Sequence, residues 1–296
     1  MDATMSADQD KFHPSYVSPD ADLILLSDDG IKFRAHSLIL SQASKFFREM
    51  FGLPRPEKEN PEDAIPIGES SLVTKAMLDI IYPGETEPRL PTREFEFVRR
   101  LLSAAERFGI DRVNHYVRLL TKTGPFINKP LEVYVLACAF GWDDEAHGLS
   151  LKTLTLDLTS STYAKILKTL DATSLYNLFE LRWERKRQIL CYARTLASTP
   201  INEIGGCDCD EENEPLEAEN EWKSLTSYIS EKLDESAEGN FLKQFSFWDD
   251  SRLEDLWGYT CDDCGEPCVK KDALRKVFVK VLADISKDEK RRKPKN

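Results

Sequence analysis

Histidine is scarce in this chain, with four residues among 296. The motifs that carry common enzymatic chemistry are missing as well. The sequence contains no HExxH pair, no phosphate-binding P-loop, no dinucleotide-binding glycine motif and no serine nucleophile elbow. No catalytic residue and no residue that binds an organic cofactor is therefore predicted, and the sequence favours a protein that is not an enzyme.

Long apolar runs and export signals are missing too. No segment approaches the roughly 18 consecutive apolar residues of a membrane span. Residues 1–19 are polar, have no apolar centre and contain no arginine, so they predict neither a secretory signal nor a transit peptide. The seven cysteines are an odd number. We expect reduced thiols in the cytoplasm or the nucleus, where clustered cysteines indicate metal binding more than disulfides.

Basic residues are fewer than acidic residues. The 40 lysines and arginines face 52 aspartates and glutamates, which gives a net charge of −12. Nucleic acid binding depends on neutralising phosphates, so we do not expect it here. Only residues 287–296 are basic. Within them, Lys290–Lys295 has the composition of a nuclear localisation signal, and equally that of a solvated terminal segment.

What is present begins with a hairpin pattern. The apolar run 23–26 is followed by Asp29-Gly30 and then by the alternating apolar run 31–35. An Asp-Gly pair between two such runs predicts a β-hairpin with a type I′ turn, which needs positive φ at both central residues. Two short helical patterns follow, the second over residues 46–51.

These features together resemble the BTB/POZ domain. The resemblance is carried by the hairpin, by Ala35-His36 directly after it, and by the helical pair that ends in Met50-Phe51. It covers residues 20–122. It implies an α+β fold, with the BTB/POZ fold followed by a mostly α-helical C-terminal region, and it implies an interaction module that is not a catalyst.

Individual positions bear on which of the known BTB binding activities this chain could have. In repressor-type BTB domains an aspartate at the place of Asp22 pairs with a basic residue just after the histidine. That residue is Ser37 here, so we expect Asp22 and His36 to make structural hydrogen bonds. Residues 52–57 give no good match to the hydrophobic-x-Glu motif of ubiquitin-ligase adaptors. Cullin binding and homodimerisation both stay open.

Local signals predict further elements of this region. Pro66 confines a short strand at 64–67 to a sheet edge. Ser70 can cap the helix after it, and Thr92 begins the next helix. Gly109 stands where that helix is expected to end in a left-handed cap.

The chain from Pro130 onward has a helical pattern. In the longest helix Arg182, Arg185, Lys186 and Arg187 are placed on the solvent side. The region resembles the C-terminal helical extension of a group of fungal BTB-domain proteins. The helices are expected over residues 131–140, 144–154, 163–170 and 173–195, and again over 222–233 and 272–285.

Composition divides the chain into six parts. They are a disordered leader (1–19), the BTB/POZ domain (20–122), a helical extension (123–204), an acidic linker with cysteines (205–221), a C-terminal helical region with a cysteine cluster (222–286) and a basic disordered tail (287–296).

Five of the seven cysteines are clustered. Cys261 and Cys264, with a glycine directly after the second, have the form of a zinc knuckle, and Cys207 and Cys209 form a shorter pair. Four thiolates suit tetrahedral zinc, and two cysteine pairs also occur in the fungal group. We predict one structural zinc on these four residues, with Cys268 able to replace a weak ligand. The alternative is free thiols.

Cys138 and Cys191 are isolated from these pairs and lie on apolar helical faces, where we expect them to be ordinary core residues.

The sequence therefore favours a non-enzymatic adaptor whose partners are proteins. Two other readings stay open. One is a substrate adaptor of a cullin ubiquitin ligase, in which the helical extension recruits the substrate. The other is a transcription-associated nuclear factor that depends on the basic tail.

Overall fold

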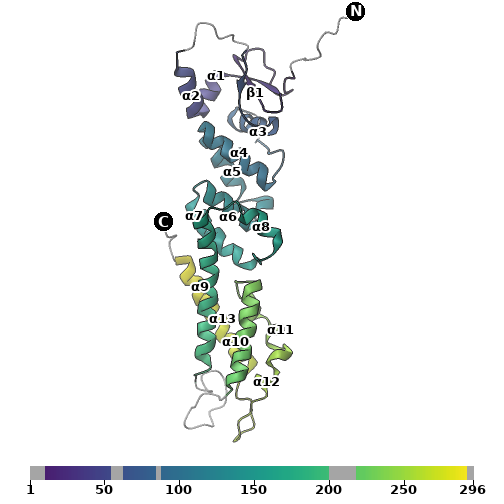
Figure 1. Ribbon diagram of the computed structural model, residues 1–296, viewed down its shortest axis with the longest axis vertical. Coiled ribbons are helices and arrows are strands. Elements are labelled where there is room, and N and C mark those ends of the chain that lie inside the picture. The colour runs from purple at the N-terminus through teal and green to yellow at the C-terminus, as the bar shows by residue number, and fades with distance from the viewer. Residues whose placement is uncertain (1–10, 55–62, 85–87, 200–217, 292–296) are drawn as a thin grey trace, which may run out of the picture. The chain divides into compact units, whose positions relative to one another are not determined.

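The computed structural model describes residues 11–54, 63–84, 88–199 and 218–291 (Figure 1). The chain divides into two compact units, residues 1–129 and residues 130–296. Each unit is described by itself.

The N-terminal unit combines a small sheet with helices. In the described part of the chain the sheet has the strand order β2-β1-β3, with β1 antiparallel to β2 and parallel to β3. The strands bury Leu25 and Phe33, and the helices add apolar faces such as that of Leu101. This confirms the α+β class. The elements are β1 (Leu23–Leu26), β2 (Lys32–Ala35), α1 (Ser37–Ala43), α2 (Lys45–Gly52), β3 (Ile65–Pro66), α3 (Ser71–Ile81), α4 (Phe95–Phe108) and α5 (Asp111–Leu120).

The predicted hairpin is present, but its turn differs from the prediction. Gly30 N donates to Ser27 O at 3.0 Å, which makes Asp28 and Asp29 the central residues. Gly30 follows them with φ of +78°. The prediction of a type I′ turn at Asp29-Gly30 is therefore wrong. The loop has three residues instead of two, and only the last of them, Gly30, has the positive φ that favours glycine. The Asp29 carboxylate instead accepts a hydrogen bond from Ser71 N, 2.8 Å away at the start of α3.

Replacing Gly30 with valine is expected to lower the free energy of unfolding by about 1–2 kcal/mol, because a side chain disfavours positive φ. Nothing lies within 4 Å of a Cβ at this position, so backbone strain alone sets the cost. Thermal unfolding beside a Gly30→Asn control, which tolerates this conformation better, measures the effect. A valine variant that melts like the wild type would refute the assigned turn.

Other local signals are confirmed, with one shift. Pro66 lies in the edge strand β3, Ser70 caps α3, and Gly109 ends α4 with φ of +61°. The helix predicted to begin at Thr92 begins at Phe95. The reason is that the Thr92 hydroxyl accepts a hydrogen bond from a backbone N–H two residues later, which forms a turn before the helix.

The prediction of a disordered leader is wrong for residues 11–19. His13 N donates to Lys32 O at 2.8 Å, so this segment runs beside β2. Tyr16 is 8% exposed and its ring lies 5.6 Å from that of Phe33. The segment is polar in composition, but one buried aromatic ring and backbone hydrogen bonds attach it to the sheet. Residues 1–10 lie outside the described residues.

The C-terminal unit is helical in its described part. The predicted helices between residues 130 and 196 are confirmed to within a few residues. Its helices are α6 (Pro130–Ala139), α7 (Asp143–Lys152), α8 (Ser161–Leu167), α9 (Ala172–Leu196), α10 (Glu219–Glu235), α11 (Phe245–Trp248), α12 (Glu254–Trp257) and α13 (Lys271–Arg291).

Two predicted boundaries in this unit are shifted. The end of the acidic linker was placed at residue 221, but Ala218 is buried and α10 begins directly after it. The basic tail was expected to be disordered from residue 287, but α13 continues to Arg291. In both places charged residues form the exposed side of a helix whose apolar side packs. Residues 200–217 and 292–296 lie outside the described residues.

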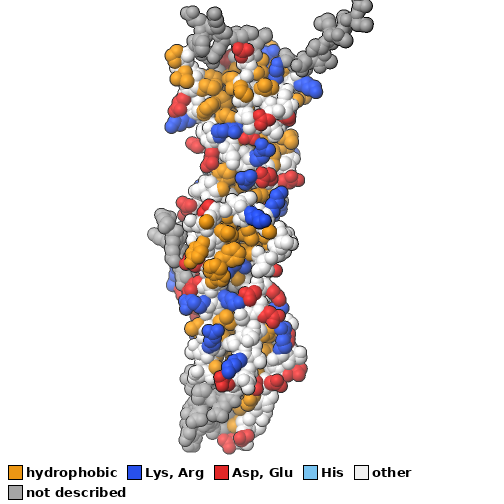
Figure 2. Space-filling view, viewed as in Figure 1, with side chains coloured by type: hydrophobic (Ala, Val, Ile, Leu, Met, Phe, Trp, Pro, Cys, Tyr) orange, Lys and Arg blue, Asp and Glu red, His pale blue; other side chains and the backbone are white. Residues whose placement is uncertain are grey.

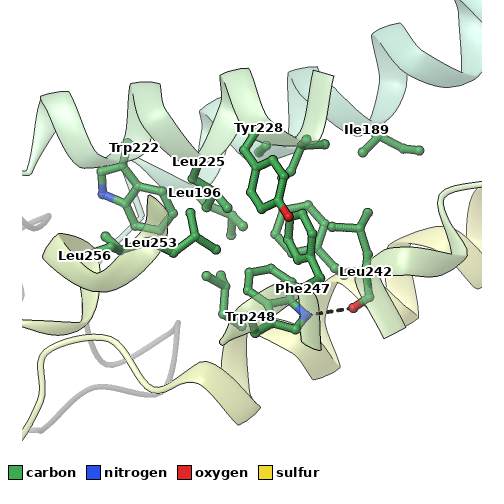
Figure 3. Close-up of a cluster of buried hydrophobic side chains, with 14 of the residues drawn as sticks. Ile189, Leu196, Trp222, Leu225, Tyr228, Leu242, Phe247, Trp248, Leu253 and Leu256 are labelled. Atoms are coloured by element: carbon green, nitrogen blue, oxygen red, sulfur yellow. Dashed lines mark hydrogen bonds between the residues drawn. The ribbon is translucent and has the colours of Figure 1, made fainter. Parts of the chain in front are cut away.

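The main core of the C-terminal unit is rich in aromatic side chains (Figure 3). Trp248 is 1% exposed, and its Nε1 donates to Leu242 O at 2.8 Å. The ring of Phe247 stacks on that of Tyr228 with centroids 4.6 Å apart. Helices α11 and α12 supply part of this core. They were not predicted, because a helix of four residues is too short to show a period.

Two arginines of α9 that were predicted to face solvent are buried. Arg182 donates to the backbone oxygen of Leu156 at 2.9 Å, and burial lowers the pKa of Arg182 to about 10. Arg185 forms an ion pair with Glu289 of α13 and donates to Glu238 O at 2.8 Å. The prediction was wrong because other parts of the unit cover this side of α9 and supply oxygen acceptors. Arg187 is exposed, as expected.

Candidate functional site

The start of α1 shows what Asp22 does in this chain. Ser37 N donates to Asp22 Oδ1 at 2.7 Å, and the Ser37 hydroxyl donates to the other carboxylate oxygen. Although desolvation raises the pKa of Asp22, the hydrogen bonds from Ser37 outweigh it and leave the pKa below its usual value. The carboxylate thus caps α1, which confirms the expected structural role.

His36 is held by a neighbouring tyrosine. Its backbone N–H donates to the Tyr82 hydroxyl at 2.8 Å, and its Nδ1 lies 3.1 Å from the same oxygen. A neutral imidazole with its hydrogen on Nε2 would accept from the Tyr82 hydroxyl at Nδ1. Nε2 faces Asp20 at 3.4 Å. Both ring nitrogens are engaged, so His36 has the structural role that was expected.

Apolar side chains lie exposed on the N-terminal unit. Leu38 of α1 is 67% exposed, Leu53 just after α2 is 66% exposed, and Leu72 of α3 is 54% exposed. Single exposed leucines are ordinary on a protein surface. These side chains nonetheless offer apolar contacts to a partner, and they are the candidate binding residues of this unit.

The predicted zinc knuckle folds as a tight hairpin. Cys261 N donates to Glu266 O at 2.9 Å, and Gly265 N donates to Cys261 O at 2.8 Å. Gly265 has φ of +71°, which lets the backbone curl back directly after Cys264. Cys261 is half-buried and Cys264 is exposed. The two cysteines of the Cys-x-x-Cys motif are therefore presented on one turn.

The remaining predicted ligands are not tested by this structure. Cys207 and Cys209 lie outside the described residues. Among the residues that are described, no three His, Cys, Asp or Glu side chains gather closely enough to hold a metal. Cys268 is buried beside the hairpin, and its backbone N donates to Tyr259 O at 2.8 Å.

The two isolated cysteines differ from each other. Cys138 packs against the smaller apolar cluster of the C-terminal unit, and burial raises the pKa of its thiol. Cys191 was predicted to be a core residue but is exposed. The prediction failed because Ile189 and Ala193 carry the buried face of α9 at this level, and Cys191 points away from it.

The surface charges are mixed. On the face shown in Figure 2, lysine and arginine side chains alternate with aspartate and glutamate over the described residues. Several of them pair with each other, such as Arg252 with Asp250 at 3.0 Å and Lys271 with Asp249 at 2.8 Å.

Comparison with known proteins identifies the N-terminal fold. Residues 18–123 match the BTB/POZ domain family. They form a BTB/POZ domain. The match covers the hairpin, the edge strand and helices α1 to α5, and it agrees with the region that the sequence resemblance covered. BTB domains are protein-interaction and oligomerisation modules rather than enzymes, so this domain is assigned to protein binding.

A plant protein shares part of the chain. The sequence is 30% identical over 154 residues to "BTB/POZ and MATH domain-containing protein 6" of Arabidopsis thaliana. The shared region makes up 47% of this chain and 35% of that protein, so the chain spans about a third of its relative's length. The resemblance to fungal proteins with a helical extension stays a prediction.

None of the helices in the described ranges has both the length and the apolar character needed to cross a membrane.

Proposed function

We propose that this chain is a non-enzymatic adaptor, which binds one protein through its BTB domain and another through its C-terminal unit. The observation that carries the proposal is the joining of a BTB/POZ domain to a second compact unit with a core of its own. The N-terminal unit has buried apolar residues of its own, such as Leu25, Phe33 and Leu101. A separate helical unit with its own aromatic core provides a second surface of fixed shape.

The plant relative supports the same arrangement. Its name pairs a BTB/POZ domain with a MATH domain, which is a second module in the same protein. By analogy, the C-terminal unit of this chain would take the place of the second module. Of the two alternatives, the cullin ligase adaptor is a special case of this function. The transcription-associated nuclear factor belongs to a different class of function. The reduced state expected of the cysteines fits the cytoplasm and the nucleus equally.

Affinity purification of the intact chain from its native cell, followed by mass spectrometry, tests the proposal. We expect the chain to retain other proteins. The recovered amount of at least one of them should fall at least tenfold in a Leu38→Glu variant, since Leu38 is exposed on α1 of the BTB domain. A Lys45→Ala variant changes a side chain that is 78% exposed on α2 and should retain all partners. A retained cullin would select the ligase reading. If no protein depends on Leu38, the BTB half of the proposal is wrong.

The nuclear alternative has a separate test. Deletion of Lys290–Lys295 with imaging of a tagged chain would show loss of nuclear signal if the basic end acts as a localisation signal. An unchanged distribution would remove this reading.

We also propose one structural zinc ion, held by Cys207, Cys209, Cys261 and Cys264. The hairpin fits such a role, because it presents Cys261 and Cys264 on one turn with a left-handed glycine after the second. The start of α10 shares a core with this hairpin, because Tyr259, two residues before Cys261, packs against the apolar cluster that contains Trp222 of α10. Cys209 lies nine positions before Ala218, and such a chain can span up to about 30 Å.

Bound zinc would tie the linker to the hairpin, and its binding free energy would appear as folding stability. Metal analysis of chain purified without chelator is expected to find about one zinc per chain. A Cys261→Ser/Cys264→Ser variant should lose the metal and melt at a lower temperature, whereas Cys191→Ser, at an exposed and isolated cysteine, should keep both. Zinc below about 0.2 per chain in the wild type would leave free thiols as the correct interpretation.

A further inference from the structure

Helix α9 carries a stripe of apolar residues along its whole length. Tyr176, Trp183, Leu190 and Ala197, which is the residue directly after the helix, follow one another at intervals of seven residues. Seven residues make nearly two full turns, so each lies within about 20° of the one before it around the helix axis. Phe179 lies in the same stripe, three residues after Tyr176. This is the a and d pattern with which one helix packs along another.

The C-terminal half of the stripe is covered by another helix. Leu190 and Ala197 pack against the main core, to which α10 contributes. Lys186 Nζ lies 2.7 Å from Asp234 Oδ1 of α10. Helix α10 ends one residue later, at Glu235. The contact between α9 and α10 therefore stops at about the level of Lys186, although the stripe continues.

The N-terminal half of the stripe is exposed at two of its three aromatic side chains, whereas Phe179 is half-buried against the smaller apolar cluster of the unit. Tyr176 is 56% exposed and Trp183 is 57% exposed. The ring centroids of these two lie 6.1 Å apart, and those of Phe179 and Trp183 lie 5.9 Å apart, so the three rings form one continuous surface. Figure 2 shows apolar side chains gathering over α8 and the beginning of α9. We call the three side chains the aromatic ladder.

The border of the aromatic ladder is polar. Arg187, one turn after Trp183, pairs with Glu184 at 2.8 Å. Asn177 is exposed next to Tyr176, at about 100° around the helix. An aromatic centre with a polar rim is the usual composition of a protein-binding surface, and Trp and Tyr are enriched among the residues that dominate binding energy.

We infer that the aromatic ladder binds an amphipathic α-helix of another protein. This partner helix would cover the N-terminal half of the apolar stripe of α9, just as α10 covers its C-terminal half. Continuity with the α9–α10 contact argues for a helix as the occupant, because the same heptad stripe already packs against one. The inference rests on the proposed adaptor function and assigns the partner surface of the C-terminal unit.

Site-specific photo-cross-linking in the intact chain tests the occupant. A benzoylphenylalanine at position 176 or 183 is expected to cross-link to another protein in the native cell, and one at the control position 177 is not. The cross-linked segment, located by mass spectrometry, should have apolar residues at i, i+3 or i+4, and i+7. A cross-link to this chain itself or to a second copy, equal cross-linking from position 177, or no cross-link would overturn the inference.

Binding of a synthetic peptide with the cross-linked sequence completes the test. Fluorescence anisotropy with the intact chain should show at least tenfold weaker binding for Trp183→Ala and for Tyr176→Ala, and unchanged binding for Asn177→Ala. Equal affinity of all four proteins would overturn the inference. The outcome is separable from that of the proposed function, because proteins that depend on Leu38 of the BTB domain should be retained by the Trp183→Ala chain.

Discussion

Replacing Arg185 with methionine is expected to lower the free energy of unfolding of the C-terminal unit by about 3–5 kcal/mol, the usual cost of removing one partner of a buried ion pair. The guanidinium and the Glu289 carboxylate are 3% and 7% exposed. Without Arg185 the carboxylate would stay buried without its cation, and Glu238 O would lose the hydrogen bonds that it accepts from the guanidinium.

The arrangement around this pair explains why the loss should be large. Arg185 lies on α9 and Glu289 on α13, so the pair joins two helices that are far apart in the sequence. His147 Nε2 also lies 3.1 Å from the backbone oxygen of Glu289 and connects α7 to the same place. Loss of the guanidinium would therefore weaken the contact of three helices.

Denaturant unfolding of the intact chain, followed by far-ultraviolet circular dichroism, measures the effect. Glu289→Gln should also destabilise the unit, because it removes the negative charge beside Arg185. The double variant Arg185→Met/Glu289→Leu should regain a large part of the loss, since two apolar residues need no partner. Arg187→Met is the matched control, at a side chain that is 68% exposed. A loss below about 1 kcal/mol for Arg185→Met, comparable to that of an exposed pair, would contradict the buried ion pair.

Replacing Trp248 with alanine is expected to cost about 3–5 kcal/mol, as large-to-small changes of buried aromatic residues do. The side chain is 1% exposed. Its ring lies 5.0 Å from that of Phe247 and 5.6 Å from that of Phe278, so alanine would leave a cavity between α11 and α13. It would also leave Leu242 O without the indole N–H (Figure 3).

Two controls separate the contributions in this core. Trp248→Phe keeps most of the volume and loses the hydrogen bond, so it should cost clearly less than alanine. Trp183→Ala removes an indole that is 57% exposed, and it should change the stability by less than about 0.5 kcal/mol. Thermal and denaturant unfolding of the three variants check the order. Equal stability of the alanine variants at 183 and 248 would show that Trp248 is not a core residue.

Local features of the fold could be predicted well because they depend on neighbouring residues. Ser70 was recognised as a helix cap and Gly109 as a left-handed helix end from their positions beside apolar stripes. Both effects act within one turn of helix, so the sequence contains all the information that they need. The long helix α9 was predicted for the same reason, since its 25 residues repeat the period several times.

Contacts between distant segments were predicted poorly. The burial of Tyr16 against Phe33 and the burial of Arg182 and Arg185 depend on elements that are far away in the sequence. An arginine in a helix is most often solvated, and only a buried acceptor on another element makes its burial favourable. The candidate zinc ligands illustrate the same difficulty. The hairpin of Cys261 and Cys264 could be predicted because it is local, but Cys207 and Cys209 are more than fifty residues before it, so their approach to it could not be predicted from neighbouring residues.

The sequence by itself determined that the chain begins with a BTB/POZ domain, that helices follow it, and that Cys261 and Cys264 lie together on a turn. These properties arise from short-range patterns of apolar residues, caps and turn residues, whose energies act between neighbours. Only the tertiary structure decided which faces of the helices are covered. Packing showed that α10 ends beside Lys186 and leaves Tyr176 and Trp183 exposed, while Arg185, two residues after Trp183 and on the opposite side of the helix, is buried. Burial depends on which element packs against a side chain, and the residues next to that side chain in the sequence do not reveal this element.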